Sequence, residues 1–276
     1  MRPLIEFEGA GYTYPETGVR ALAGVNVTIH RGEFIALVGA NGSGKSTLAR
    51  LCNGLLLPTE GTVRVAGRLT TEAGALAEIR RQVGVVWQDP DSQLVGATLE
   101  EDVAFGPANL GLAPAEIDVR VDQALRLVGL EGLRGRPVNS LSGGQKQLLA
   151  IAGVLAMAPD VLILDEATAM LHPAGREQVL GLAQRLALGQ TMAVVVVTHH
   201  MDEAMAASRV IAMDTGRVVF DGPPTRLLAA GHLLDRIGLA EPPLVNIARG
   251  LREAGVDVPL IWRRVEDLAE HLCRLL

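Results

Sequence analysis

Short apolar runs without polar alternation recur along the chain and predict strands that are buried on both faces. These runs are Phe34–Val38, Val83–Trp87, Val161–Leu164 and Ala193–Val197. Runs of this kind are typical of a parallel sheet that helices cover on both sides. Segments of helical periodicity lie between them, including Pro114–Val128 and Gln145–Met157. The alternation of the two patterns predicts an α/β core.

Other regions depart from this alternation. The amino-terminal runs Leu4–Phe7, Val25–Ile29 and Val63–Val65 alternate or are rich in β-branched residues, with Gly and Pro between them, and predict an antiparallel β-subdomain. The middle of the chain is mostly helical in pattern and predicts an inserted α-helical subdomain. The end of the chain predicts a short helical extension, which we interpret as a dimerisation element. The predicted boundaries are 1–225 for the main domain, roughly 89–158 for the insertion within it, and 226–276 for the extension.

Composition narrows the functional classes. The chain has 276 residues, of which 49% are hydrophobic and 20% charged, and this balance is that of a folded globular protein. A formal charge of −6 and the lack of a basic run longer than a pair argue against nucleic-acid binding as the main function. Cys52 and Cys273 lack metal-ligand spacing, so we expect reduced thiols in the cytosol. The sequence shows no signal-peptide pattern.

A glycine-rich motif follows the first buried run. Its residues are Gly39, Ala40, Asn41, Gly42, Ser43, Gly44, Lys45 and Ser46, followed by Thr47. The spacing matches G-x-x-x-x-G-K-[ST], in which backbone N–H groups and a helix N-terminus surround the phosphates of a nucleotide. We expect Lys45 to reach the β- and γ-phosphates and the Ser46 hydroxyl to bind Mg²⁺. The motif therefore predicts ATP and Mg²⁺ as cofactors.

Two carboxylates end a later buried run. Val161–Leu164 brings Asp165 to the carboxyl end of a strand, where α/β sheets bind ligands, and Glu166 follows directly. We expect Asp165 to hold Mg²⁺ through water and Glu166 to polarise an attacking water molecule. An apolar run that ends in Asp-Glu is a weak signal alone. Together with the glycine-rich motif upstream, it predicts a P-loop NTPase with a RecA-like core.

A second motif has the features of a phosphate-binding helix start. Leu141, Ser142, Gly143, Gly144 and Gln145 place a hydroxyl and two glycine N–H groups where a helical pattern begins. One nucleotide does not need two such cradles from one chain. The pentapeptide resembles the signature of ABC ATPases, where it closes on ATP held by the phosphate loop of the opposite subunit. The resemblance implies a dimer with ATP between its subunits.

The remaining landmarks of that family follow in order, and the resemblance covers residues from about 4 to 225. Gln88 matches a glutamine that touches Mg²⁺ and the attacking water, and His199 matches a histidine that contacts the γ-phosphate. Family members stack an aromatic ring on adenine, which implies this role for Tyr14, with Tyr12 as the alternative. The residues to which the resemblance assigns catalysis are Glu166, His199 and Lys45.

One position departs from the family pattern. The family usually has Asp where this chain has His172, in the loop that follows Glu166. That aspartate lies at the dimer interface and helps to shape the partner's catalytic site. The histidine leads to the hypothesis of an asymmetric dimer with a second, non-identical ATPase.

Two segments, 88–94 and 100–112, are similar to those of the ATPases of energy-coupling factor transporters, which import vitamins and cobalt or nickel. The resemblance implies a peripheral ATP-hydrolysing motor subunit at the cytoplasmic face of the cell membrane. Its implied partners are a second ABC ATPase (a copy or, preferably, a paralogue), a transmembrane coupling subunit and a small substrate-binding membrane subunit, and no nucleic acid.

In that family, arginine-bearing helices of the transmembrane subunit dock on the segment that follows Gln88. Acidic side chains of this chain would supply complementary charge, or would only favour a helix N-terminus. These side chains are Asp91, Glu100, Glu101 and Asp102. Two other functions stay open: the ATPase of an ordinary binding-protein-dependent importer, and a soluble ABC factor in translation or DNA repair. The soluble factors usually carry tandem cassettes, coiled-coil insertions or basic arms, and the sequence shows none.

Overall fold

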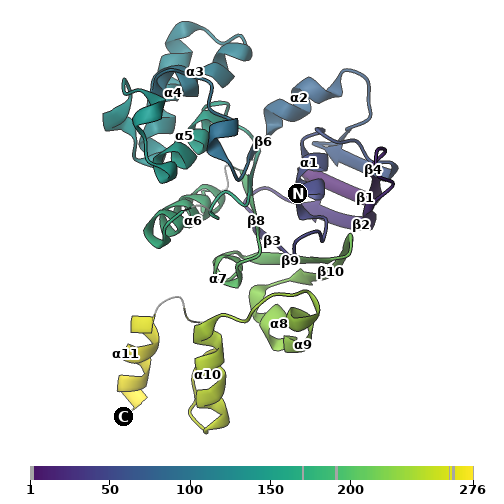
Figure 1. The fold of residues 1–276 in the computed structure, drawn as a ribbon, viewed down its shortest axis with the longest axis vertical. Coiled ribbons are helices and arrows are strands. Elements are labelled where there is room, and N and C mark those ends of the chain that lie inside the picture. Colours follow the sequence, from purple (N-terminus) through teal and green to yellow (C-terminus); the bar gives the residue numbers. More distant parts are fainter. Residues whose placement is uncertain (1–2, 170, 190–191, 261, 263–264, 276) are drawn as a thin grey trace.

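Two β-sheets form the frame of the chain in the computed structural model, which describes residues 3–169, 171–189, 192–260, 262 and 265–275 (Figure 1). The larger sheet has six strands in the order β10-β9-β3-β8-β7-β6, and all neighbours are parallel except β10, which is antiparallel to β9. Its strands are β3 (Phe34–Val38), β6 (Val83–Val86), β7 (Val161–Asp165), β8 (Ala193–Thr198), β9 (Arg209–Asp214) and β10 (Arg217–Gly222).

The predicted α/β core is confirmed by this sheet. Every residue of β3, β7 and β8 is buried, as the apolar runs without alternation predict. Because parallel strands share a direction, the carboxyl ends of β3, β7 and β8 meet at one edge. The glycine-rich motif and the Asp-Glu pair both lie at this edge.

The second sheet has four antiparallel strands in the order β2-β1-β4-β5, which confirms the predicted β-subdomain. Its strands are β1 (Ile5–Thr13), β2 (Arg20–Ile29), β4 (Glu60–Val65) and β5 (Arg68–Leu69). Helix α1 (Lys45–Cys52) packs into one apolar core with both sheets, since Leu48 shares this core with Ile5 and Val195. The helix ends at Cys52, and the chain turns at Gly54, which has a φ of 67°.

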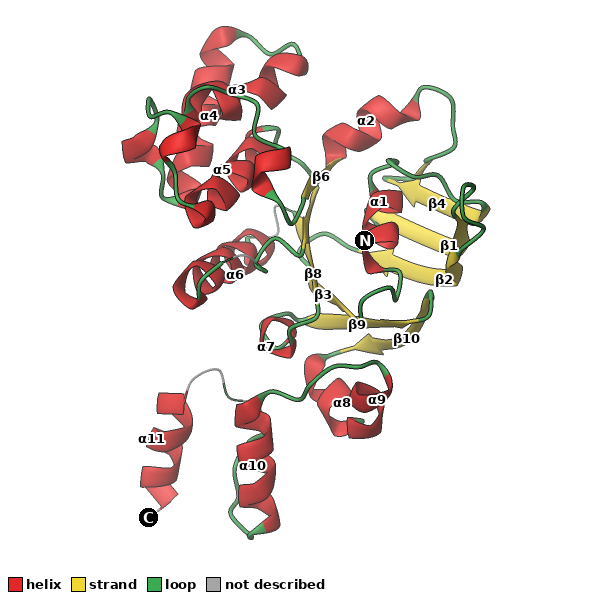
Figure 2. Ribbon diagram, viewed as in Figure 1, coloured by secondary structure: helices red, strands yellow, loops and turns green. Residues whose placement is uncertain are grey.

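A helical group lies between β6 and β7 in the sequence and apart from the antiparallel sheet in space (Figure 2). Its elements are η1 (Pro90–Ser92), α3 (Leu99–Asn109), α4 (Pro114–Val128), η2 (Glu131–Leu133), η3 (Val138–Ser140) and α5 (Gly143–Ala156). Leu99, Leu125 and Leu149 are fully buried and belong to the same apolar core as Val86. The group therefore packs against the larger sheet through apolar residues of α3, α4 and α5.

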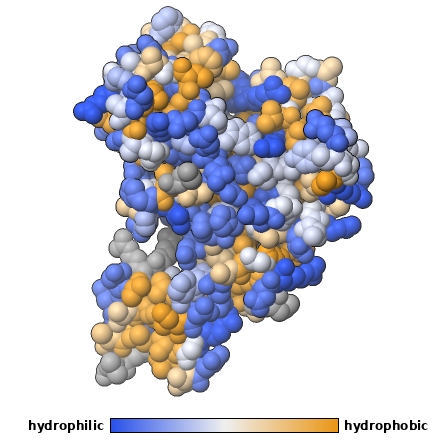
Figure 3. All heavy atoms as spheres, in the orientation of Figure 1, coloured by the Kyte–Doolittle hydropathy of each residue, from blue (hydrophilic) through white to orange (hydrophobic). Residues whose placement is uncertain are grey.

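The remaining helices flank the larger sheet or follow it in the sequence. They are α2 (Ala75–Gln82), α6 (Pro173–Leu188), α7 (Met201–Ala204), α8 (Pro224–Ala229), α9 (Gly231–Arg236), α10 (Pro243–Glu253) and α11 (Val265–Leu275). Figure 3 shows apolar surface where α10 and α11 lie, and both Ile247 and Val265 are more than half exposed. Within the described ranges, no helix combines the length and apolarity needed to cross a bilayer. The residue boundaries of the three predicted parts stay a prediction.

Candidate functional site

The turn between β3 and α1 closes tightly against its surroundings. Gly39 has a φ of 148°, and a Cβ there would lie 2.3 Å from the carbonyl oxygen of Met213. Gly44 has a φ of 105°, and its Cβ would lie 2.6 Å from the carbonyl oxygen of Ala21. Only glycine fits both positions without strain. The turn thus leads the backbone directly into the N-terminus of α1, where phosphates bind well.

Lys45 is held at the base of this turn. Its Nζ donates hydrogen bonds to the carbonyl oxygens of Gly39 at 2.8 Å and Ala40 at 2.9 Å. Burial lowers the pKa of Lys45, and the nearby Glu166 and Asp165 carboxylates oppose this shift. The lysine is therefore an almost fully buried cation beside two acidic groups.

Asp165 ends β7 in a buried position next to the same turn. The hydroxyl Oγ of Ser46 donates a hydrogen bond to its Oδ1 at 3.1 Å. Burial raises the pKa of Asp165, whereas this hydrogen bond lowers it. The strand end and the helix start are thus linked through two oxygen-bearing side chains.

Glu166 has an unusual backbone conformation directly after β7. Its φ is 51°, and its N–H donates a hydrogen bond to the carbonyl oxygen of Val197 at 3.0 Å. A left-handed residue other than glycine costs about 1–3 kcal/mol and is found most often at functional sites. Glu166 Oε1 lies 3.8 Å from Nδ1 of His199, whose ring is 4.2 Å from that of His200. Adjacent strands β7 and β8 therefore bring the predicted catalytic carboxylate and histidine together.

A cleft of about 1190 Å³ opens over this edge of the sheet. Most of the predicted nucleotide and metal residues line it: Tyr14, Asn41, Gly42, Gly44, Lys45, Ser46, Thr47, Gln88, Asp165 and Glu166. Gly39, Ala40, Ser43 and His199 are not among its lining residues. The Tyr14 hydroxyl is 3.1 Å from Oγ1 of Thr47, while Tyr12 is buried in the core and packs edge-on against Tyr14. The structure therefore favours Tyr14 over Tyr12 as the aromatic residue of the cleft.

The side chains in the cleft fit a nucleotide with a divalent metal ion. The Ser46 hydroxyl, the Asp165 carboxylate and the Gln88 amide supply oxygen atoms, the ligand type that Mg²⁺ prefers. Ser43 Oγ is buried and has no hydrogen-bond partner in the described part of the chain. Because Ser43 does not line the cleft, this hydroxyl is not one of the groups that face the cleft in this structure.

Comparisons with known proteins identify the family. The model of the ABC transporter family matches residues 22–169. The energy-coupling factor transporter ATP-binding protein EcfA1 of Symbiobacterium thermophilum is 49% identical over 99% of this chain and 98% of its own length. EcfA1 of Caldanaerobacter subterraneus subsp. tengcongensis is 43% identical over 99% of this chain and all of its own. The chain belongs to this family of energy-coupling factor ATPases.

Solved structures agree with this assignment. The structure of cbiO1 from Clostridium perfringens, part of the ABC transporter complex cbiONQ, has a TM-score of 0.79 at 36% identity and covers 91% of this chain and 100% of its own. The dimeric structure of MJ0796, a bacterial ABC transporter cassette, has a TM-score of 0.72 at 32% identity and covers 80% of this chain and 98% of its own. The predicted fold class is confirmed, as is the function as an ATP-binding and ATP-hydrolysing subunit of an energy-coupling factor transporter.

The signature of this energy-coupling factor ATPase forms the start of α5. Ser142 and Gln145 make a capping box, in which the Ser142 Oγ accepts from the Gln145 N–H at 3.3 Å and the Gln145 Oε1 accepts from the Ser142 N–H at 3.0 Å. Nothing in the described chain lies within 4 Å of where a Cβ on Gly143 would be, and Gly144 would meet only Leu171 at 3.6 Å. Among the described residues that line the cleft, none comes from the signature. The two predicted phosphate-binding motifs of this ATPase thus do not share one pocket.

His172 has a structural role that the sequence did not reveal. Its Nδ1 accepts a hydrogen bond from the Gly175 N–H at 3.3 Å and so caps the N-terminus of α6. The loop before it is anchored at Thr168, whose hydroxyl donates to Oε1 of the fully buried Glu203 at 2.7 Å. Arg176 approaches the same oxygen at 3.4 Å. This network, which sequence patterns missed, links the loop after Glu166 to α7, which follows His199.

The cleft also contains residues that no motif indicated. The guanidinium of Arg50 lies over the ring of Trp87, 5.6 Å from its centroid, and both line the cleft. Thr215 and Gly216 line it from the turn between β9 and β10. Arg50 could have been suspected, because it falls one helical turn after Ser46 on α1. The turn residues lie far along the sequence and only the fold brings them to the cleft.

Of the two alternatives for the four acidic residues, charge for a docking partner or stabilisation of a helix N-terminus, the first is excluded for Asp102. Asp102 is buried, and its Oδ1 accepts from the N–H groups of Val95 and Gly96 at 2.7 and 2.9 Å. Glu101 belongs to the capping box of α3, and Glu100 pairs with Arg134 at 2.8 Å. Helix-start stabilisation explains this acidic run better than partner binding. Asp91 differs, because 66% of its side chain is exposed.

Proposed function

We propose that the cleft binds ATP with Mg²⁺ and hydrolyses it through Glu166. The observation that supports this most directly is the meeting of three groups at one sheet edge: the Ser46–Asp165 hydrogen bond, the buried Lys45 ammonium, and Glu166 at 3.8 Å from His199. Tyr14, at the side of the cleft, stacks on adenine. The residues of the turn between β3 and α1, from Gly39 to Thr47, surround the phosphates.

Each catalytic group has one task in this proposal. Lys45 exchanges its carbonyl contacts for the β- and γ-phosphate oxygens. Ser46, Asp165 and Gln88 would hold Mg²⁺, which would supply positive charge beside the phosphates. Glu166 orients and deprotonates the attacking water, and His199 donates a hydrogen bond to the γ-phosphate. The left-handed backbone of Glu166 fixes its direction before substrate arrives.

A second cassette completes the site. Ser142 and Gly143 of the signature are exposed, and none of the five signature residues lines the cleft of its own chain, which supports binding to ATP held by another subunit. The dimeric structure of the similar cassette MJ0796 is in line with such an arrangement. Because His172 stands where the family usually has aspartate, we favour a paralogous ATPase over an identical copy.

The complete assembly is an importer. We infer a transmembrane coupling subunit and a small substrate-binding membrane subunit, with this chain bound at the cytoplasmic face and a vitamin or a transition-metal ion as cargo. The relative cbiO1 is part of a complex, cbiONQ, which supports a multi-subunit assembly. On this chain, Val95 lies before α3 and Phe105 lies on it, and both are more than half exposed. These residues offer apolar surface to a membrane partner.

Affinity purification from the native host tests the assembly. Tagged chain from gently solubilised membranes should retain a transmembrane coupling protein, a small membrane protein and a second ATPase, all identifiable by mass spectrometry. Recovery of periplasmic-type or lipid-anchored binding proteins would instead indicate an ordinary importer. Recovery of ribosomal or DNA-repair proteins without membrane proteins would overturn the transport assignment.

A single substitution tests the chemistry. Glu166→Gln in this complex should lower the ATPase rate by about 10²–10⁴-fold while ATP binding persists, because only the general base is lost. ATP-dependent retention of the two cassettes, measured by size-exclusion chromatography, should increase. Normal hydrolysis by the variant would exclude the assigned role of Glu166.

A further inference from the structure

The helix that begins with the signature also holds the segment that follows β6. Lys146, directly after Gln145, forms an ion pair with Asp91, with Nζ at 2.6 Å from Oδ1. The next residue, Gln147, donates a hydrogen bond from Nε2 to the carbonyl oxygen of Trp87 at 3.2 Å. Two successive residues of α5 therefore contact both ends of a short segment, residues 87–91.

The contact at Trp87 is the buried one. Gln147 is 1% exposed, and its Oε1 has no hydrogen-bond partner among the described residues. Burying an amide is costly unless it is hydrogen-bonded, so the single bond to Trp87 strongly determines the position of this side chain. The Trp87 carbonyl also accepts from Nε2 of Gln93 at 3.3 Å. Both lone pairs of one carbonyl oxygen are thus used to fix the chain immediately before Gln88.

Trp87 is fixed on its other side by the helix that follows the phosphate loop. Its ring lies under the Arg50 guanidinium, at 5.6 Å from centroid to Cζ, within the cleft. Its backbone is anchored to α5 and its ring to α1. Gln88, which also lines the cleft, therefore directly follows a residue that contacts both α1 and the signature helix α5.

We propose that Lys146 and Gln147 are positioning residues that hold the Gln88 segment on the signature helix. Through this connection, the ATP site of the cassette itself and the ATP site of the opposite cassette, which its signature completes, respond to ATP together. When α5 shifts as the signature engages ATP on the opposite cassette, the Trp87 carbonyl and Asp91 move with it. Gln88 then changes its position in the cleft. The inference rests on the proposed function in one respect, the engagement of the signature with another cassette.

The ion pair can be tested by substitution. Lys146 is one of the only two lysines in the chain, and the other is the buried Lys45. Its side chain is 21% exposed and that of Asp91 is 66% exposed, so reversing either charge does not disturb the core. The exposed i,i+4 pair Asp122–Arg126 on α4 offers a control with the same change in charge.

The experiment measures ATPase rate against ATP concentration in the complex purified from host membranes. We expect a Hill coefficient above 1 for the wild type, and for Lys146→Asp a coefficient near 1 with half-saturation at about three- to tenfold more ATP. The exchanged pair Asp91→Lys with Lys146→Asp should return half-saturation to within about twofold of the wild type. Arg126→Asp should leave both quantities unchanged.

Three outcomes would contradict the inference: a wild-type Hill coefficient of 1, a Lys146→Asp variant that behaves as Arg126→Asp does, or an exchanged pair as defective as the single variant. A wild-type complex that does not hydrolyse ATP would instead contradict the proposed function. The two failures are therefore distinguishable.

Trp87 itself gives a second measurement that does not depend on turnover. The chain has two tryptophans, so Trp262→Phe leaves Trp87 as the single tryptophan of this chain. In this background with Glu166→Gln, ATP should change the emission of Trp87 beyond the change that ATP in its own cleft causes, and adding Ser142→Arg, which blocks signature engagement, should remove that additional change. Gln147→Leu should have the same effect as Ser142→Arg. A full emission response in either variant would overturn the proposed connection.

Discussion

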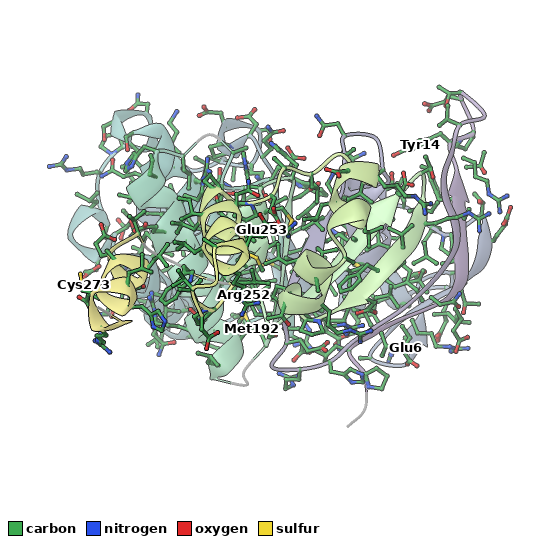
Figure 4. The ribbon with its side chains drawn as sticks, turned by 90° about the horizontal axis from the view of Figure 1, so that it is seen from below. Glu6, Tyr14, Met192, Arg252, Glu253 and Cys273 are labelled. Atoms are coloured by element: carbon green, nitrogen blue, oxygen red, sulfur yellow. The ribbon has the colours of Figure 1, made fainter. Side chains whose placement is uncertain are left out.

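Two glycine-containing turns of this chain lead into helices, one before α1 and one at α5, and their surroundings differ. The turn before α1 is closed: Gly39 and Gly44 have positive φ and their Cβ positions are blocked by backbone carbonyls. The signature at α5 is open around Gly143 and exposes Ser142. Figure 4 places Tyr14, beside the first turn, on the opposite side of the view from Cys273 of α11.

Under the proposed function, this difference separates the residues that bind ATP within one chain from those that complete the site of another chain. The closed turn brings a buried cation, Lys45, and a buried carboxylate, Asp165, to a cleft within the same chain. The signature has a satisfied helix cap but contributes nothing to that cleft in the described residues. A motif with free space around it is suited to a ligand that another molecule brings. The variants below test this contrast in order of decreasing effect.

The largest effects should separate binding from hydrolysis. Lys45→Ala should weaken ATP binding to the isolated chain by about one to two orders of magnitude, because a charge-assisted contact to phosphate is lost. Ser142→Arg should leave that affinity unchanged and abolish hydrolysis in the complex. Binding is measured by equilibrium dialysis and hydrolysis by phosphate release. If Ser142→Arg weakened ATP binding to the isolated chain, the signature would belong to its own cleft and the contrast would fail.

Alanine at the two glycine turns should affect folding unequally. Gly44→Ala forces a Cβ to 2.6 Å from the Ala21 carbonyl oxygen at a φ of 105° and should lower the free energy of unfolding by about 2–3 kcal/mol. Gly143→Ala has free space and a helical position, so its effect on unfolding should stay within about 0.5 kcal/mol. Urea titration of both variants without nucleotide measures this. Equal destabilisation would show that the signature turn is as constrained as the phosphate loop.

Buried charge should make the closed turn dependent on pH. Burial raises the pKa of Asp165, so its ionised form destabilises the chain and the stability associated with its neutral form is lost as pH rises through that raised pKa. Asp165→Asn should therefore raise the thermal midpoint at pH 7, and this gain should shrink as pH falls toward the unfolded value of about 3.9. Melting curves without nucleotide or metal from pH 4 to pH 7 measure the effect. The hydrogen bond from Ser46 works in the opposite direction, so an unchanged midpoint would show that it fully offsets burial.

Much of the difference between the turn before α1 and the signature at α5 was predictable from the sequence, and the part that was not has a physical cause. An apolar run such as Phe34–Val38 has to be buried on both faces of a sheet, and the spacing of the glycine-rich motif requires one backbone geometry. The core and the phosphate loop could therefore be predicted from the local sequence pattern. The contacts of Glu203 and Trp87 depend on elements that are distant in sequence. Asp102 was misjudged because an acidic residue near a helix start is equally compatible with solvent, a partner or, as found, two backbone N–H groups. The residues whose roles local pattern could not assign are those with long-range partners.

The smallest expected effect concerns the loop that leads from Glu166 to α6. His172 caps α6 through Nδ1, and aspartate is at least as good an N-cap and adds a favourable charge at the helix N-terminus. His172→Asp should therefore raise the free energy of unfolding of this chain by about 0.3–1 kcal/mol, as measured by urea titration.

The same substitution bears on the partner, because the family resemblance puts this position at the dimer interface. The measurement uses a mixed dimer with the native second ATPase, in which Glu166→Gln in this chain removes hydrolysis at its own site. In this background, His172→Asp should change the rate of ATP hydrolysis at the opposite site. A stabilised chain with an altered opposite site would mean that the histidine is retained for asymmetry at the cost of a better cap. A stabilised chain with an unchanged opposite site would make His172 a cap only, and the two catalytic sites would then differ for reasons outside this loop.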